Sequence, residues 1–205
     1  MSEPRLWSAA GAGRSALLGG LVALWLLGGC STTIIPRADV EQPATVYVVD
    51  KGRTPSLVIP SSGGGLVRYA YGEWHWYALR ETGLFRGAAA LLWPTRGALG
   101  RERLRGPATL STVERHIPGA EEIHPLTVEL ALVRELQQHL DGLYQAHRET
   151  EVYAHDVRLH FVHHPRRYSW FWNSNHMVAA WVRDLGCDTR GLSFLSQWDV
   201  EAATP

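Results

Sequence analysis

The chain has 205 residues, of which 45% are hydrophobic, and it carries 20 basic and 20 acidic side chains. This length suits one domain with a buried core. A balanced charge gives no sign of a nucleic-acid partner, because such proteins concentrate positive charge to meet phosphates. We therefore expect a single folded domain that binds no nucleic acid.

Residues 1–29 have the pattern of a bacterial secretory signal. Arginines precede an apolar run, Ala16 to Leu27, which is shorter than the roughly 20 apolar residues of a membrane-spanning helix. The run ends in Leu-Gly-Gly-Cys30, which resembles the lipobox of bacterial lipoproteins. The resemblance implies cleavage before Cys30, a lipid on its sulfur and the membrane as a partner. A short anchor that stays attached is the alternative.

Ser31 follows the cysteine. By resemblance to enterobacterial sorting rules, this residue favours the outer membrane over the inner one, with the domain facing the periplasm. Residues 30–44 are polar, contain two prolines and show no periodicity, which predicts a lipidated cysteine followed by a flexible tether. The folded domain is then expected over residues 45–200.

The first half of this domain has the alternation and the turn residues of antiparallel strands. We expect strands over Thr45–Asp50, Ser56–Pro60, Leu66–Tyr71 and Trp74–Leu79. The Gly-rich segment between the second and third strands lacks the spacing and the lysine of a phosphate-binding loop, so we expect no nucleotide cofactor.

The second half adds helices. Leucines recur every three or four residues from Pro125 to His147, which predicts the longest helix. The remaining expected elements are a helix over Thr82–Trp93, a loop over Thr95–Gly106, and strands over Ala108–Ile117 and Glu151–His164. This order predicts an α+β domain, with an antiparallel sheet and helices packed to one side.

The stretch from Tyr168 to Cys187 carries the sharpest candidate site. It begins extended and aromatic, becomes helical at Asn173-Ser174-Asn175, and ends at Gly186. Free N–H groups and a partial positive charge at a helix N-terminus can stabilise a developing anion, which suits a nucleophilic serine. Capping by Ser174 or Asn173 is the more common use of these residues.

A serine nucleophile needs a base within hydrogen-bond reach and an acid that orients the base. His176 lies too near in sequence to be the obvious base. His75 is the better long-range candidate, with Glu73 as the orienting acid.

Tryptophans predict a second kind of site. Trp74 and Trp76 would share one strand face, and Trp170 and Trp172 would share another. A groove between the two pairs would suit a peptide or a glycan strand. Burial in the core is the alternative for most of them.

Two clusters of polar residues admit a functional interpretation, but an ordinary one is favoured for each. His160 and His164 would share a strand face with His163 pointing away, which leaves too few ligands for zinc, so we expect no metal. Four arginines between residues 96 and 105 could contact anionic lipid headgroups or lipopolysaccharide. A solvated loop is the simpler interpretation of these arginines.

Three segments resemble the conserved blocks of the bacterial family named domain of unknown function 2459: TVYVVDKGRTPSLVIP, YAYGEWHWYAL and NSNHMVAAWVRDLGC. The resemblance covers most of the domain. It implies a circularly permuted, NlpC/P60-like variant of the papain-like fold, in which an early His and a late Cys meet. Here the His position holds Thr54 and the Cys position holds Ser174. Thiolate chemistry is excluded at that position, and the resemblance implies a degenerate site.

The sequence thus predicts a lipid-anchored envelope protein, whose papain-like domain binds or scaffolds a peptide or glycan ligand without catalysis. The alternative is a serine-dependent amidase or esterase. In that alternative Ser174 is the nucleophile, His75 and Glu73 are its partners, and the helix N–H groups form the oxyanion hole.

Overall fold

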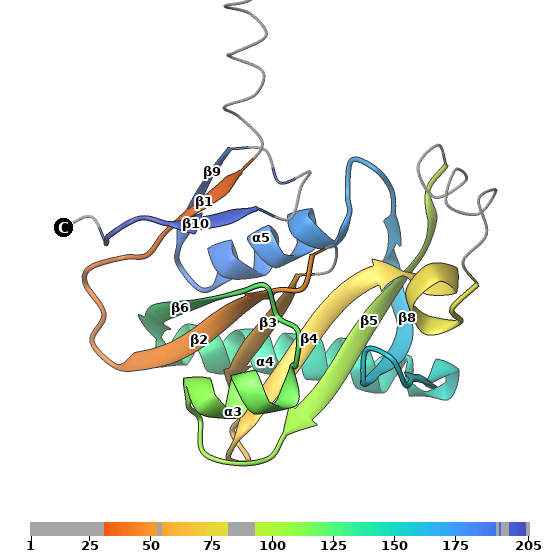
Figure 1. Cartoon of the computed structure of the whole chain (residues 1–205), viewed down its shortest axis with the longest axis horizontal. Helices are drawn as coiled ribbons and strands as arrows, with labels where there is room; N and C mark the ends of the chain where they lie inside the picture. Colours follow the sequence, from red (N-terminus) through yellow and green to blue (C-terminus); the bar gives the residue numbers. More distant parts are fainter. Residues whose placement is uncertain (1–30, 53–54, 82–92, 192, 194–196, 204–205) are drawn as a thin grey trace, which may run out of the picture.

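A computed structural model of the chain describes residues 31–52, 55–81, 93–191, 193 and 197–203. The described part forms two sheets and a small set of helices (Figure 1). The larger sheet has seven strands in the order β6-β2-β3-β4-β5-β8-β7, and all neighbouring strands are antiparallel. The α+β class with an antiparallel sheet is therefore confirmed.

The bounds of the elements are as follows. The large sheet contains β2 (Pro43–Asp50), β3 (Ser56–Pro60), β4 (Leu66–Glu73), β5 (Thr95–Leu104), β6 (Glu122–Glu129), β7 (Val152–Ala154) and β8 (Leu159–Tyr168). In the small sheet, β1 (Thr32–Ile35) lies between β9 (Asp188–Gly191) and β10 (Trp198–Val200). The helical elements are the π-helical turn η1 (Trp74–Ala78), α3 (Leu110–His116), α4 (Leu130–Ala146), the short turn η2 (Arg148–Thr150) and α5 (Ser174–Asp184).

The main core lies on one face of the large sheet, under α4 and α5. Alternate residues of β4 point into it, among them Tyr69 and Tyr71, which are fully buried. In Figure 1, α5 lies between the large and the small sheet, and Ile34 and Trp198 of the small sheet complete the same cluster. Burying an apolar side chain of this size contributes roughly 1.5–3 kcal/mol, so this layer supplies much of the stability.

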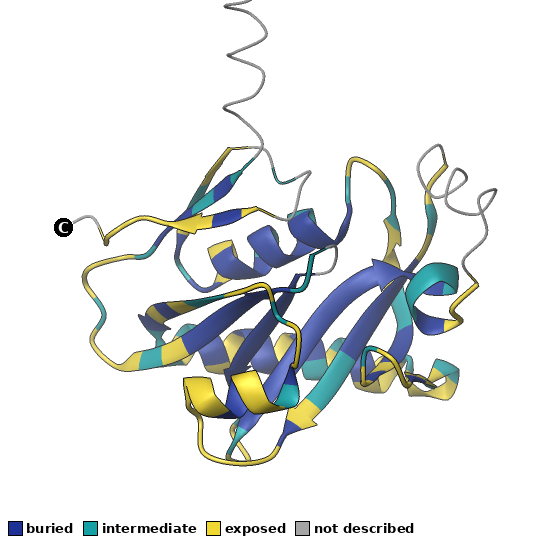
Figure 2. Cartoon of the chain, viewed as in Figure 1, coloured by how far each residue is buried: buried dark blue, intermediate teal, exposed yellow. Residues whose placement is uncertain are grey.

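The opposite face of the sheet is covered as well. α3 packs Val113 and Ile117 over one part of that face, and η1 packs Trp74 and Ala78 over another. Figure 2 shows the outward side of α3 exposed, whereas the central strands are buried. The expectation that the helices gather on one side is therefore wrong in part, since only α4 and α5 do so.

The expected tether over residues 30–44 differs most from the structure. Residues 32–35 form β1, with Thr32, Ile34 and Ile35 buried, and the strand pairs with β9 and β10 from the end of the chain. β2 also begins earlier than expected, at Pro43. The partners of β1 lie more than 150 residues away, so local composition could not reveal them.

Trp74–Leu79 is a turn rather than the expected strand. The Glu73 carboxylate accepts a 2.7 Å hydrogen bond from the Trp76 N–H and caps the turn, and the Leu79 N–H donates to the Trp74 carbonyl at 3.1 Å. The turn also brings the Tyr77 ring over Gly72, where an added Cβ would lie only 2.3 Å from Tyr77 Cδ2. The alternating aromatic residues of Trp74–Leu79 therefore belong to a helical turn and not to a β-strand.

Three further predictions are corrected. The expected loop at 95–106 contains the long strand β5, in which arginines flank the buried residues and make the segment look polar. The expected strand at 108–117 contains the helix α3. Pro125 lies within the eight-residue strand β6, and the helix expected from Pro125 onward begins only at Leu130. β6 is an edge strand, where a proline is tolerated because one side needs no donor.

Several predictions fall outside the described residues. These are the signal sequence over residues 1–29, Cys30, Thr54 and nearly all of the helix expected over Thr82–Trp93. Within the described residues, no helix is both long enough and apolar enough to cross a membrane.

Candidate functional site

The helix N-terminus at α5 is capped by Asn173. Its side-chain oxygen accepts hydrogen bonds from the N–H groups of Asn175 at 3.0 Å and His176 at 3.2 Å, and it lies 2.9 Å from His176 Nδ1. Two of the N–H groups that an oxyanion would need are thus already used. Ser174 is the first helical residue and is only 2% exposed. In the part of the chain that the structure describes, no hydrogen bond joins its hydroxyl to an imidazole.

The expected partners of Ser174 have other roles. His75 Nδ1 lies 3.0 Å from Glu81 Oε2, and the Glu73 carboxylate caps η1. η1 packs on the face of the sheet opposite to α5. The structure therefore does not bring Ser174, His75 and Glu73 together as nucleophile, base and acid.

The four tryptophans do not line a common groove. Trp74 is 7% exposed and packs its ring against His163 on the η1 face, with the ring centroids 4.2 Å apart. Trp172 packs against the main core on the other face, under the guanidinium of Arg166 at 4.0 Å. Trp76 lines a small cavity beside η1, and Trp170 is partly exposed. Within the described residues, the two pairs therefore do not face each other across a groove.

The histidines of β8 and the second cysteine, Cys187, were the other residues with possible metal-binding or thiol chemistry. Among the described residues, no three side chains of the metal-binding types come together. Burial lowers the pKa of His164 to about 4 and also lowers that of His163, which favours neutral rings. Cys187 is buried, and burial raises the pKa of its thiol to about 11, so it is an inert part of the core.

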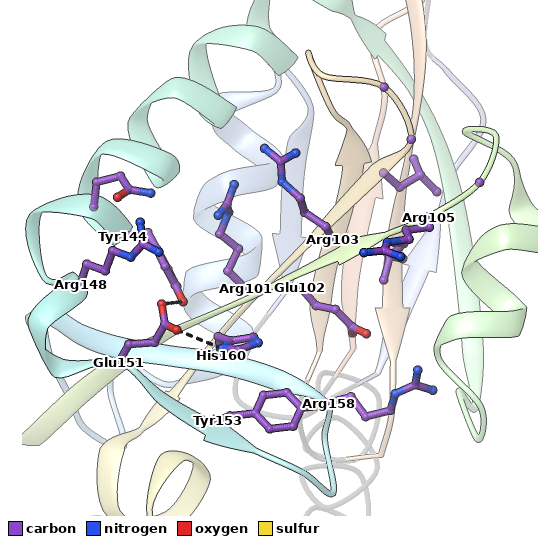
Figure 3. Close-up of a pocket in the computed structure, with 16 residues that line it drawn as sticks. Arg101, Glu102, Arg103, Arg105, Tyr144, Arg148, Glu151, Tyr153, Arg158 and His160 are labelled. Atoms are coloured by element: carbon purple, nitrogen blue, oxygen red, sulfur yellow. Dashed lines mark hydrogen bonds and ion pairs between the residues drawn. The ribbon is translucent and has the colours of Figure 1, made fainter.

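A cleft with a volume of about 770 Å³ lies at the far end of β5. β8 pairs with β5 only as far as Arg101, so β5 continues beyond its neighbour and leaves an open edge. The C-terminal end of α4 and the turn between β7 and β8 form the other walls (Figure 3). The cleft contains arginines from three separate segments: Arg101, Arg103 and Arg105 from β5 and the loop after it, Arg148 from η2, and Arg158 from the β7–β8 turn.

One of these arginines is held by the fold. Arg101 Nε lies 2.8 Å from the carboxylate of Asp141, which also accepts a 2.7 Å hydrogen bond from the Tyr69 hydroxyl. The Arg101 guanidinium lies over the Tyr144 ring, 5.3 Å from its centroid. Arg101 therefore joins β5 to α4 and forms part of the floor of the cleft.

The other arginines of the cleft are not held in ion pairs. Within the described residues, none of Arg103, Arg105, Arg148 and Arg158 forms an ion pair with a carboxylate. All four are exposed in the same cleft. Guanidinium groups in this arrangement suit carboxylate or phosphate ligands, because each presents paired N–H donors to two oxygens.

The two carboxylates in the cleft are already occupied. Glu151 accepts a 2.7 Å hydrogen bond from the Tyr144 hydroxyl and lies 3.2 Å from His160 Nδ1 (dashed in Figure 3). The hydrogen bond from Tyr144 is the main cause that lowers the pKa of Glu151. Glu102 lies 3.8 Å from the buried guanidinium of Arg68, although burial raises the pKa of Glu102 overall. Neither carboxylate forms an ion pair with one of the four exposed arginines, although the charge of Arg158 lowers the pKa of Glu102 and that of Arg148 lowers the pKa of Glu151 from a longer distance.

Arg158 has an unusual backbone. Its φ angle is +57°, in the left-handed region that side chains with a Cβ adopt at a cost of roughly 1–2 kcal/mol. A glycine would remove that cost, so the side chain at this turn is kept against the preference of the backbone. The Arg158 side chain lines the cleft, whereas Arg80, which has the same φ angle, does not, so the angle alone assigns no function.

The sequence signal for this site is the run of arginines in β5, which by itself does not differ from the arginines of an ordinary solvated surface. The contributions of Tyr144, Arg148, Glu151 and Arg158 come from other segments and carry no recognisable spacing. Comparison with protein families, with curated proteins and with solved structures found no match for this chain.

Proposed function

We propose that this chain is a non-catalytic binding domain of the bacterial cell envelope, which holds an anionic peptide or glycan ligand in the arginine cleft. The observation that carries the proposal is the set of four exposed guanidinium groups around one cleft that form no close ion pair with a carboxylate, while the cleft contains only two carboxylates among the described residues. A surface that needed only solubility would intersperse charges of both signs. Convergent cations of one sign raise the local concentration of an anionic ligand.

The proposal keeps two further expectations. A lipid on Cys30 would attach the domain to the envelope, facing the periplasm, with the outer membrane favoured by Ser31. The permuted papain-like ancestry would explain why a helix begins at the position of a lost cysteine, Ser174. Ser174 is buried, and His75 and Glu73 interact with other groups than Ser174. This arrangement favours binding over hydrolysis.

Titration calorimetry on the full chain tests this function. A hexaglutamate peptide supplies carboxylates and glucosamine 6-phosphate supplies a phosphate, whereas hexaglutamine and glucosamine are the controls without anionic groups. We expect at least one acidic probe to bind, and we expect binding to weaken as salt rises, since exposed charges are screened over about 8–10 Å at physiological ionic strength.

A matched set of variants locates the binding. R103Q combined with R158Q should weaken binding at least tenfold, because each charge-assisted contact contributes about 1.5–3 kcal/mol. R115Q removes an exposed arginine of α3, outside the cleft, and should leave binding unchanged. If neither acidic probe bound, or if R115Q weakened binding as much as the cleft variants, the proposal would be wrong.

A further inference from the structure

Two aromatic residues occupy the tip of a tight turn between β8 and α5. The turn is closed by hydrogen bonds between the backbones of Ser169 and Trp172, 3.0 Å in each direction. Tips of such turns favour Gly, Asn, Asp and Pro. The two residues at the tip of this turn are Trp170, which is 45% exposed, and Phe171, which is 76% exposed. Full burial of a ring such as that of Phe171 would contribute roughly 1.5–3 kcal/mol, so exposed aromatic rings gathered at one place indicate an interaction surface.

A third aromatic residue lies at the same end of the sheet. β5 and β8 are antiparallel, with Thr95 opposite Tyr168, so the residues before β5 and those after β8 emerge together. Trp93 precedes β5 and is 71% exposed. A hydrogen bond of 3.2 Å from Arg167 Nη1 to the Pro94 carbonyl joins the two segments. We call Trp93, Trp170 and Phe171 the aromatic edge.

Cations flank the aromatic edge. Arg166 and Arg167 end β8 and are exposed, and Arg96 at the start of β5 is exposed as well. Tryptophan and phenylalanine beside arginine form the composition that settles at a bilayer surface, with the rings among the headgroups and the cations on their phosphates. Aromatic residues and arginines are also common in protein interfaces, so the choice of a membrane depends on where the edge lies in the fold.

The place of the edge in the fold supports a membrane as its occupant. In Figure 1 the start of β5, the connection between β8 and α5 and the start of β1 all reach the upper border of the molecule. The chain before β1 contains the apolar run Ala16–Leu27 and ends at Cys30, two residues before Thr32. A membrane that held this N-terminal segment would therefore face the aromatic edge.

We propose that the aromatic edge rests on the headgroup layer of a bilayer containing anionic lipid, as a second membrane contact beside the N-terminal segment. The two contacts would fix the orientation of the domain. β5 starts at the aromatic edge and carries arginines of the cleft at its other end, about 30 Å away for nine residues of extended chain. The arginine cleft would then open away from the membrane.

A fluorophore at the edge tests this orientation. The full chain with C30S keeps the apolar run Ala16–Leu27 as its N-terminal membrane contact and has only the buried Cys187, so a single cysteine introduced by F171C can be labelled with the environment-sensitive dye NBD. The matched control is L110C, at an exposed position on α3, which lies at the lower border of Figure 1. Both proteins are reconstituted into vesicles of phosphatidylcholine and phosphatidylglycerol.

We expect the dye at position 171 to shift its emission to shorter wavelengths and to be quenched by spin-labelled lipid, whereas the dye at position 110 should do neither. Unchanged emission at 171, or equal changes at both positions, would overturn the proposal. The role of charge is tested separately, because R167E or omission of phosphatidylglycerol should reduce the shift at 171. A shift that persisted in full under both conditions would refute the preference for anionic lipid.

Discussion

The Tyr144 hydroxyl and the Glu151 carboxylate are 2.7 Å apart and connect the last turn of α4 with the segment that leads into β7. This hydrogen bond is the main reason that the pKa of Glu151 is lowered, with His160 contributing in the same direction. The pair supports one wall of the arginine cleft, so its loss should affect stability in a way that depends on pH.

We expect Y144F to lower the free energy of unfolding by about 1 kcal/mol at neutral pH, as a hydrogen bond of ordinary strength would. Because the pKa of Glu151 is lower in the folded state, its contribution is present above the unfolded pKa and is lost as pH falls through the folded pKa. Wild type should therefore lose more stability below about pH 4.3 than Y144F. Urea unfolding across this range measures the difference, and parallel curves would refute it.

His164 gives a second pH dependence, at higher pH. Burial against Tyr71 lowers its pKa from 6.5 to about 4, so the unfolded chain takes up a proton before the folded one. Stability should fall between pH 6.5 and 4 and level off below. H164N keeps a hydrogen-bond acceptor but cannot titrate, so its unfolding free energy should vary less over this window, as urea unfolding would show. An equal slope in both proteins would contradict the prediction.

Asn173 and Ser174 should differ in their effect on stability. N173A removes the cap of α5 and should cost about 1 kcal/mol, whereas S174A should change stability by less than about 0.5 kcal/mol. Thermal unfolding of both variants measures this contrast. We also expect no labelling of Ser174 by a fluorophosphonate probe. Stable labelling that S174A abolished would restore the hydrolase hypothesis.

Two glycines provide a matched test of packing. G72A would place a Cβ 2.3 Å from the Tyr77 ring, and overpacking of this kind costs about 1–3 kcal/mol. G142A lies in α4 with no neighbouring atom within 4 Å, so it should stabilise the protein by about 0.5–1 kcal/mol. Chemical denaturation of both variants should show shifts of opposite sign. Shifts of the same sign would mean that η1 is not held against β4 as described.

Arg158 should show a conflict between stability and binding. R158G relieves the left-handed backbone and should stabilise the protein by about 1 kcal/mol. The same change removes one cation from the cleft and should weaken binding of an acidic probe. Unfolding and calorimetry on one preparation measure both effects. A variant that was less stable, or that bound the probe as tightly as wild type, would contradict the assignment of Arg158 to the cleft.

Local patterns predicted well the elements whose signals lie within the segment and its flanking residues. The strand Ser56–Pro60 agrees with the structure residue for residue, and the helix after Asn173 was located correctly with its end near Gly186. The strand is a continuous apolar run that is buried on both faces and bounded by turn residues, whereas the helix repeats with a helical period and has its cap beside it. Prediction from sequence succeeds where the residues that determine an element lie within it or next to it in the sequence.

Other elements depend on contacts distant in sequence. β1 is a strand only because β9 and β10 pair with it, and β6 displaces the first turns of the expected helix because β2 offers it an edge. The arginine cleft was missed for the same reason. Its members become a site only when β5, η2 and the β7–β8 turn meet, and the sequence shows one basic run among them.

The small sheet has a mechanical consequence. β1 is hydrogen-bonded on both sides, to β9 and to β10, and the chain leaves it at the N-terminal end. A pulling force applied there acts along the strand and loads both rows of hydrogen bonds in shear, so they must break together instead of one at a time. The last strand of the chain therefore helps to set how much tension the first strand withstands.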